Sequence, residues 1–292
     1  MDALEIASGD NSPSRHWLCV ALAYVILGLG IFFLLIILII IIISARMFHR
    51  ESTRTSTIEA LFGYVLSHSE KYENEKDGVI SLTQLPTLAE MLGVSLDDTS
   101  MYRLAWAWSC GTPLTITKSE FVNGTREACV FMKSSNVPLS ALRQLVKSPS
   151  ADFELYLCAI RGHLDAMDAI LHKDMQQFRL FYRFIFRWVR APETTVRGPS
   201  EVGMNVETAV ELWRMLFPEY QTFKQLDEWV AFCSSRDDFG REIVGKDLWE
   251  QLLEFTTVES YSTYDVNDAW PSAMDDFVQF YNAKMQSGVN PS

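Results

Sequence analysis

Residues 240–247, GREIVGKD, have the spacing of a phosphate-binding loop: a glycine, four residues, then a glycine and a lysine. Such a loop needs serine or threonine next, to hold Mg²⁺, and Asp247 stands there instead. A carboxylate would repel the phosphates, and the preceding residues, AFCSSRDDF, do not resemble a buried strand. We therefore interpret Asp247 as the start of a helix, where the free N–H groups and the helix dipole favour an acid.

A second stretch resembles the loop of a calcium-binding EF-hand. Residues 73–84, ENEKDGVISLTQ, place Glu73, Glu75 and Asp77 where oxygen ligands belong, with Gly78 at the sharp turn and Ile80 at the buried apolar position. The last position needs a bidentate glutamate, and Gln84 occupies it. This substitution favours a loop that is kept as structure.

A third stretch, residues 109–120, repeats part of that pattern. It keeps Ile116 and ends in Glu120, but it has no acid before Glu120, so it cannot hold calcium in the usual way. The two loops together indicate an EF-hand-like pair used as structure. A membrane-anchored calcium sensor or adaptor is the alternative interpretation.

Other groups of reactive residues are sparse. The cysteines are scattered without a C-x-x-C, which indicates a reducing compartment and no zinc site. Asp165, Asp168 and His172 share one helix face, which we interpret as solvated. No Ser/His/Asp arrangement is present, so the sequence predicts no catalytic residue, no metal site, no cofactor and a protein that is not an enzyme.

Four arginines form a basic stripe between aromatic residues: Arg179, Arg183, Arg187 and Arg190. Such a stripe is typical of long side chains that cover a packed face and keep their charge in water. A docking surface for an acidic partner is the alternative.

The segment 17–43 contains no charged residue and is long enough to cross the hydrocarbon core of a bilayer. We predict a polar tail at 1–16, a membrane helix at 17–44 and a linker at 45–55. Arg46, Arg50 and Arg54 follow the segment, which predicts a single-pass protein whose C-terminal domain is cytosolic. A lumenal domain is the alternative, and the sequon at 123–125 would then be open to glycosylation.

The rest of the chain shows helical periodicity nearly to its end. In IEALFGYVLSHSEKY, Ile58, Leu61, Phe62 and Val65 recur at helical spacing, and later segments repeat this pattern. The predicted fold class is all-α: an EF-hand-like pair, a C-terminal helical bundle and one membrane helix. The formal net charge is -12 and residues 225–292 carry most of it, which excludes nucleic acid as a main partner and favours a basic one.

Three C-terminal motifs, in this order, resemble the defective-in-cullin-neddylation family: KDLWEQLLEF at 246–255, YDVNDAWP at 264–271 and MDDFVQF at 274–280. LAWAW at 104–108, SEFVNG at 119–124, FYRFIF at 181–186 and RAP at 190–192 agree with it. The resemblance implies a potentiating-neddylation domain over residues 56–286, with an insertion within 125–180.

The resemblance implies two binding sites. The first is an acidic surface for the winged-helix region of a cullin, formed by Asp247, Ala269 and Asp275. Ala269 would leave room for a long basic side chain, and charge-assisted hydrogen bonds would hold it. Asp265, Asp268 and Asp276 are nearby acids that would steer the partner.

The second implied site is an apolar pocket for the acetylated N-terminus of the neddylation E2. By motif, its walls are Ile80, Met101, Leu104, Ala105, Trp108, Leu114, Trp188, Leu212 and Met215. The sequence departs from the family pattern at Pro113, where we expect glutamine, and at Leu212, where we expect tyrosine.

The implied activity is that of a non-catalytic co-E3. It would hold the cullin and the charged E2 together, beside the RING subunit and the ubiquitin-like modifier, and so promote transfer to the cullin. The membrane helix would confine this activity to one cytosolic membrane face.

Overall fold

The computed structural model describes residues 13–68, 78–135, 137–190, 203–235, 243–258, 260, 261, 264 and 270–287, with side chains from residue 32 onward. Helices dominate these residues, so the predicted all-α class is confirmed. The chain divides into two compact units, residues 1–56 and 57–292, and each is described by itself. The cullin-neddylation domain limits predicted from sequence, 56–286, stay a prediction.

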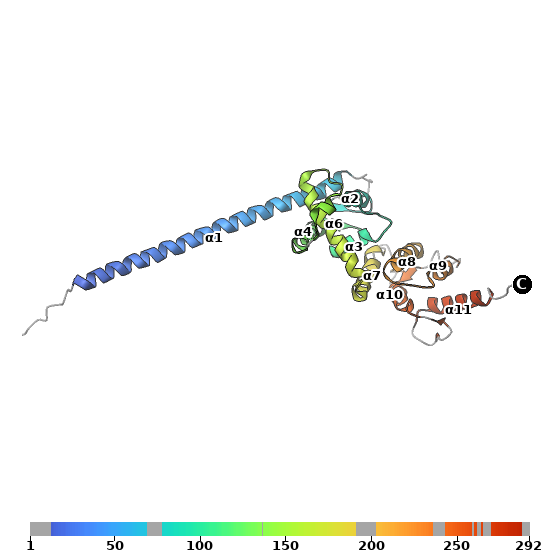
Figure 1. Ribbon diagram of the computed structural model, residues 1–292. Helices are drawn as coiled ribbons and strands as arrows, with labels where there is room; N and C mark the ends of the chain where they lie inside the picture. Colours follow the sequence, from blue (N-terminus) through green and yellow to red (C-terminus); the bar gives the residue numbers. More distant parts are fainter. Residues whose placement is uncertain are drawn as a thin grey trace, which may run out of the picture. The chain divides into compact units, whose positions relative to one another are not determined.

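The helices are α1 (Pro13–Ser67), α2 (Leu85–Leu92), α3 (Ser100–Ala107), α4 (Lys118–Ser134), α5 (Leu139–Arg143), α6 (Ala151–Leu171), α7 (Met175–Val189), α8 (Val206–Tyr220), α9 (Leu226–Ser235), α10 (Lys246–Phe255) and α11 (Ser272–Ser287). The strands are β1 (Val79–Ile80), β2 (Ile116–Thr117), β3 (Gly203–Asn205) and β4 (Ile243–Gly245). Figure 1 shows them in chain order.

Helix α1 is 55 residues long and runs without a break through the predicted linker. Residues 45–55 contain no glycine or proline, so nothing in them interrupts the helix. Thr53 and Thr55 also turn their hydroxyls back onto the carbonyls of His49 and Glu51. From Phe32 onward α1 is long and apolar enough to cross a membrane, by length and composition.

Two short antiparallel ribbons tie segments that lie far apart in the chain. β1 pairs with β2, placing Ile80 opposite Ile116, and β3 pairs with β4, placing Met204 opposite Val244. Strands of two or three residues are too short to show alternation, which is why the sequence did not predict them. The first ribbon joins the two loops that resemble calcium loops.

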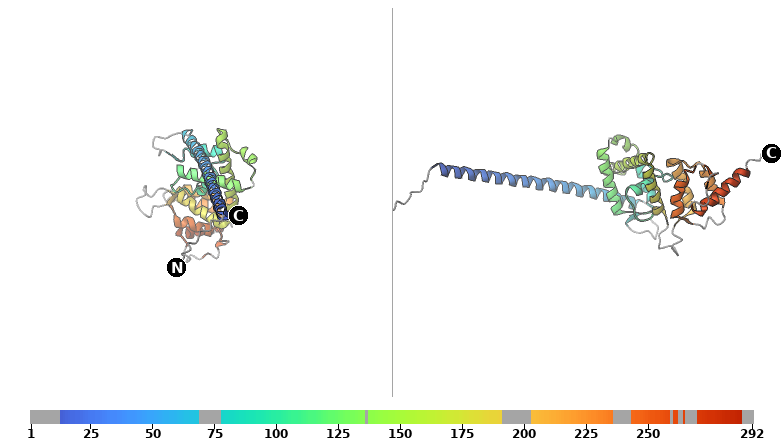
Figure 2. Two further views of the ribbon diagram at one scale, coloured as in Figure 1. Left: turned by 90° about the vertical axis from the view of Figure 1, so that its left-hand side faces the viewer. Right: turned by 90° about the horizontal axis from the view of Figure 1, so that it is seen from below.

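In the second unit, α6 packs against α2, α3, α4 and α5, and α7 bridges from α3 and α6 to α10. Helices α8 and α9 pack on each other and α9 packs on α11. Figures 1 and 2 show these two groups of helices on either side of α7. Residues 125–180, where we predicted an insertion, form part of this core, because Leu157, Ile160 and Leu164 of α6 are buried.

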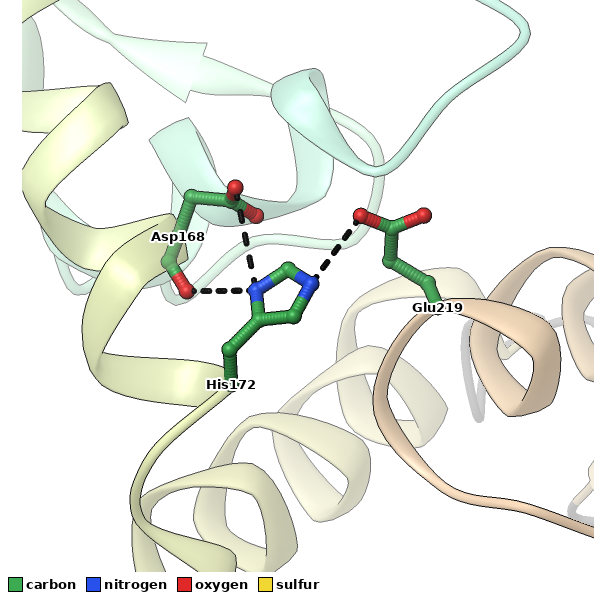
Figure 3. A group of neighbouring side chains, drawn as sticks. All are labelled: Asp168, His172 and Glu219. Carbon is green, nitrogen blue, oxygen red and sulfur yellow. Dashed lines mark hydrogen bonds and ion pairs between the residues drawn. The ribbon is translucent and has the colours of Figure 1, made fainter.

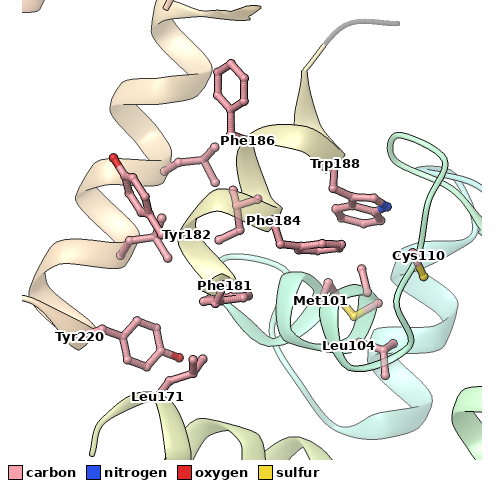
Figure 4. Packing of buried hydrophobic residues seen from close by; sticks show 14 of the residues in the cluster. Met101, Leu104, Cys110, Leu171, Phe181, Tyr182, Phe184, Phe186, Trp188 and Tyr220 are labelled. Carbon is pink, nitrogen blue, oxygen red and sulfur yellow. The ribbon is translucent and has the colours of Figure 1, made fainter. Parts of the chain in front are cut away.

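Aromatic side chains fill the centre of the second unit. The ring of Tyr182 stacks on Trp249 with centroids 4.3 Å apart, Trp213 stacks on Trp249 in turn, and Trp229 packs edge-on against Trp213. The indole of Trp213 donates to the Tyr182 hydroxyl at 2.9 Å, and that of Trp249 donates to the Tyr182 carbonyl at 3.0 Å. Burial raises the pKa of Tyr182 well above its usual value, so this hydroxyl stays protonated. Figure 4 shows the part of the core around α7.

Candidate functional site

Asp247 lies in the first turn of α10, as expected for an acid at a helix start. Its side chain is exposed, and Gln251, one turn further on, donates to its Oδ1 at 2.8 Å. Strand β4, which ends at Gly245, leads directly into the helix, so the described residues 243–247 of this motif form a strand and a helix start and no phosphate-cradling loop. Asp247 therefore presents a fixed carboxylate to solvent.

Asp275 lies in the first turn of the next helix, α11, and is half-buried. The Tyr264 hydroxyl donates to its Oδ1 at 2.6 Å. The rings of Tyr264 and Trp270 both pack edge-on against Phe255, at 6.0 and 5.6 Å. Tyr264 and Trp270 are thus fastened to the end of α10, and Tyr264 orients the Asp275 carboxylate.

The structure does not describe the complete acidic surface. Ala269, Asp265 and Asp268 lie outside the described residues. Asp247 and Phe255 are at opposite ends of α10, about 12 Å apart along its axis at the usual rise per residue. Asp275 is connected through Tyr264 to the Phe255 end of α10, whereas Asp247 lies at the opposite end of that helix. Within the described residues, no interaction joins Asp247 to Asp275.

Two of the four arginines in the basic stripe are engaged inside the molecule. Arg179 donates to Glu254 of α10 at 2.9 Å, and Arg183 lies 3.7 Å from Glu250 on the same helix. These ion pairs join α7 to α10. Neither interpretation of the stripe, a solvated face or a docking surface for an acidic partner, predicted ion pairs within the domain. Arg187 is exposed.

The nine residues predicted to line the E2 pocket mostly lie in the core. Ile80, Leu104 and Ala105 are fully buried, and Met101, Trp108, Trp188 and Leu212 are nearly so. Leu114 and Met215 are half-buried. Leu114 has a positive φ of 51° and its N–H donates to the carbonyl of Trp188, which ties the loop after α3 to the end of α7.

A hollow of about 450 Å³ opens beside this group. It is lined by Trp106, Ser109, Cys110, Gly111, Pro113, Phe184, Arg187, Trp188 and Arg190. Trp188 is the one residue that it shares with the nine. Figure 4 shows Trp188, Phe184 and Met101 gathered on the side of α7 that faces this loop.

The hollow was not predicted as such, although one signal was present. Phe184 and Trp188 are spaced by one helical turn in FYRFIFRW, and they face the loop that follows LAWAW. The indole nitrogen of Trp188 is buried and has no hydrogen-bond partner within the described residues. Desolvation, with a smaller contribution from the charge of Glu120, raises the pKa of Cys110 to about 12, so its thiol is no nucleophile near neutral pH.

The two loops that resemble calcium loops use their last residues to hold backbone. Gln84 accepts from the Ser81 N–H at 2.8 Å. Glu120 accepts from the N–H groups of Gly111 and Thr117 at 2.8 and 2.7 Å. Glu73, Glu75 and Asp77 lie outside the described residues. The carboxylate that would close a calcium site in the second loop is already engaged.

The cullin binding family matches residues 159–280, which contain α7 to α10, most of α11 and both acidic positions. This part of the chain is thus similar to cullin binding domains, and the relatives that match most of the chain are DCN1-like proteins. The chain is 26% identical to DCN1-like protein 3 of Drosophila melanogaster over 222 residues. The aligned residues make up 75% of this chain and 56% of the Drosophila protein. DCN1-like protein 3 of Homo sapiens is 25% identical over 214 residues, 72% of this chain and 59% of the relative.

DCN1-like protein 3 of Xenopus laevis is 24% identical over 220 residues, covering 74% of this chain and 62% of the relative. The resemblance to the defective-in-cullin-neddylation family is confirmed by these matches. The chain spans less than two thirds of the length of these DCN1-like relatives.

Proposed function

We propose that this chain is a membrane-anchored, non-catalytic co-E3 that binds a cullin and promotes its neddylation. The observation that carries the proposal is the pair of oriented carboxylates, Asp247 and Asp275, within the matched cullin-binding domain. Each stands in the first turn of a helix and has one oxygen held by a donor from its own surroundings. This preorganisation lowers the cost of engaging a basic partner.

The cullin partner would supply lysine or arginine side chains. Within the described residues, no hydrogen bond uses the second oxygen of Asp247 or of Asp275, so these oxygens are available for charge-assisted bonds. Ala269 completes the proposed surface, because a small residue between the acids would admit a long basic side chain. The acidic excess of the last quarter of the chain would steer the encounter.

The neddylation E2 is the second proposed partner. Its acetylated N-terminus would enter at the loop after α3 and the end of α7, where Trp188 joins the nine predicted walls to the hollow. Most of those walls are already buried, so the peptide would need them to part or would use the hollow instead. An acetyl carbonyl fits the unpartnered indole N–H of Trp188 as a hydrogen-bond acceptor.

The mechanism needs no covalent step by this chain. A scaffold that holds the cullin and the charged E2 beside the RING subunit raises their effective concentration to the millimolar range of short tethers. It also restricts their orientation, so the cullin lysine attacks the thioester of the modifier more often.

The apolar part of α1 supports a single-pass anchor, and the arginines after it support a cytosolic domain. Asn123, the acceptor of the sequon, is exposed, whereas Thr125 is fully buried in α4, so a missing glycan on the folded chain has two explanations, a cytosolic domain or a blocked sequon. Protease protection of sealed vesicles therefore tests the orientation better than glycosylation does. Degradation of residues 57–292 from the cytosolic side is expected, and their protection would contradict the proposal.

Binding to the cullin is tested by a pull-down of the full chain in detergent micelles with a cullin C-terminal fragment, at low and high salt. Asp247→Asn with Asp275→Asn removes both charges and keeps oxygens for Gln251 and Tyr264 to donate to. We expect salt-sensitive binding by the native chain and a loss of at least about tenfold in the double variant, as for paired charges at interfaces.

The matched control is Asp227→Asn, which removes an exposed acid from the first turn of α9. It should leave binding unchanged. Equal binding by the double variant and the control would overturn the assignment of this surface.

A further inference from the structure

Three side chains from two helices meet away from the acidic surface: Asp168 and His172 at the end of α6, and Glu219 in the last turn of α8. One ligand atom from each lies within 4.8 Å of the other two. Figure 3 shows the imidazole between the two carboxylates. The three side chains are 32%, 41% and 51% exposed, so the group is open to solvent and to small ions.

The hydrogen bonds of His172 fix what its second nitrogen does. Nδ1 lies 2.9 Å from the main-chain oxygen of Asp168, which can only accept, so Nδ1 carries the proton. In the neutral imidazole Nε2 then has a lone pair, and it faces Oε1 of Glu219 at 3.3 Å. Two lone pairs at this distance repel each other unless a proton or a metal cation lies between them.

Asp168 is held in place by other partners. Arg103 forms an ion pair with Oδ1, and the Tyr220 hydroxyl donates to the same oxygen at 2.7 Å. Tyr220 in turn shares a hydrogen bond of 2.8 Å with Thr99. Oδ2 lies on the side of His172. Partners of this kind, one layer behind a ligand, orient carboxylates and imidazoles in metal sites.

The backbone adds negative potential at the same place. His172 caps the C-terminus of α6 and Glu219 is next to the last residue of α8, and neither helix has a basic residue in its last turn. The C-terminus of a helix carries a partial negative charge that stabilises a cation. Two carboxylates and two helix ends thus add negative potential at this place, and the charge of Arg103 is paired with Asp168.

We propose that Asp168, His172 and Glu219 form a binding site for a divalent transition-metal cation of the Zn²⁺ type. Bonds of about 2.0–2.2 Å in tetrahedral geometry place two ligand atoms roughly 3.4 Å apart, close to the 3.3 Å between Nε2 and Oε1. Asp168 contributes Oδ2, the oxygen that its contacts with Arg103 and Tyr220 do not use, and water completes the shell. The ion joins the end of α6 to the end of α8.

The site was invisible to sequence patterns because its third ligand lies on another helix. Asp168 and His172 alone, at helical spacing, fit a solvated face. Glu219 becomes a candidate ligand only because the fold brings the end of α8 next to the end of α6.

The test is a calorimetric titration of the full chain, freed of metal with a chelator, with ZnCl₂. We expect saturable binding of about one Zn²⁺. His172→Gln and Glu219→Gln should each lower the affinity by about tenfold or more. Tyr220→Phe, which removes the hydrogen bond to Asp168, should lower it by about tenfold.

Glu211→Gln is the matched control, because Glu211 is an exposed acid on the same helix, α8, outside the group. Circular dichroism confirms that each variant is folded before titration. Wild-type protein without saturable Zn²⁺ binding, or ligand variants that bind like Glu211→Gln, would overturn the proposal.

Discussion

Tyr182 shows how single side chains hold the domain that presents the acidic surface. Its hydroxyl accepts from Trp213, its carbonyl accepts from Trp249, and its ring stacks on Trp249 in the middle of α10. Asp247 lies two residues before Trp249. Packing around Tyr182 therefore positions the helix that carries one of the two acids.

We predict that Tyr182→Phe destabilises the protein by about 1–3 kcal/mol, because the buried indole N–H of Trp213 loses its acceptor. Chemical denaturation of the full chain in micelles, followed by tryptophan fluorescence, measures this change. Tyr102→Phe is the control, since Tyr102 is half-buried and its ring contact with Trp188 survives. A Tyr182→Phe variant as stable as this control would contradict the role given to the hydroxyl.

Sequence reasoning at the residue scale worked where a side chain acts within its own helix. Asp247 was expected at a helix start from its neighbours alone, and it lies there. The ion pairs of Arg179 and Arg183 with α10 and the meeting of His172 with Glu219 were not foreseen, because they depend on which helices become neighbours.

Helix α4 shows how an element fixes the loop beside the hollow. Thr117 caps the helix and Glu120 returns to the Thr117 N–H, which forms a capping box. The same carboxylate holds the Gly111 N–H, and Gly111 lines the hollow. The loop from α3 to α4 is thus held in one conformation without a metal ion.

We predict that Thr117→Ala costs about 1 kcal/mol, the usual loss when a helix cap is removed. Urea denaturation of the full chain in micelles measures it. Thr112→Ala, in the same loop but exposed and outside the cap, should change stability by no more than about 0.5 kcal/mol. Equal stability of the two variants would show that the capping box does not hold the loop.

The element scale also shows what helical periodicity could and could not predict. Helical periodicity located α3 and α7 to α11 of the second unit, since each buries one face, but it did not locate α2, α4, α5 or α6. The linker was expected after the membrane segment because residues 45–55 turn polar, yet polarity alone does not end a helix. The ribbons β1–β2 and β3–β4 carry too few residues for a periodic signal.

The whole molecule combines a helix able to cross a membrane with a region that matches the cullin binding family. The two properties are independent in the sequence, because the apolar segment lies outside the matched residues 159–280. Together they place the proposed co-E3 activity at a membrane surface. There, diffusion in two dimensions would raise the encounter rate with a cullin complex on the same membrane.

The central claim is that this chain accelerates cullin neddylation through Asp247 and Asp275. The most direct measurement is the initial rate of modifier transfer to a cullin–RING complex by charged E2, with and without the full chain in micelles. We expect the native chain and Asp227→Asn to raise this rate, and Asp247→Asn with Asp275→Asn to leave it at the level without the chain. No acceleration by the native chain, or equal acceleration by the double variant, would contradict the account.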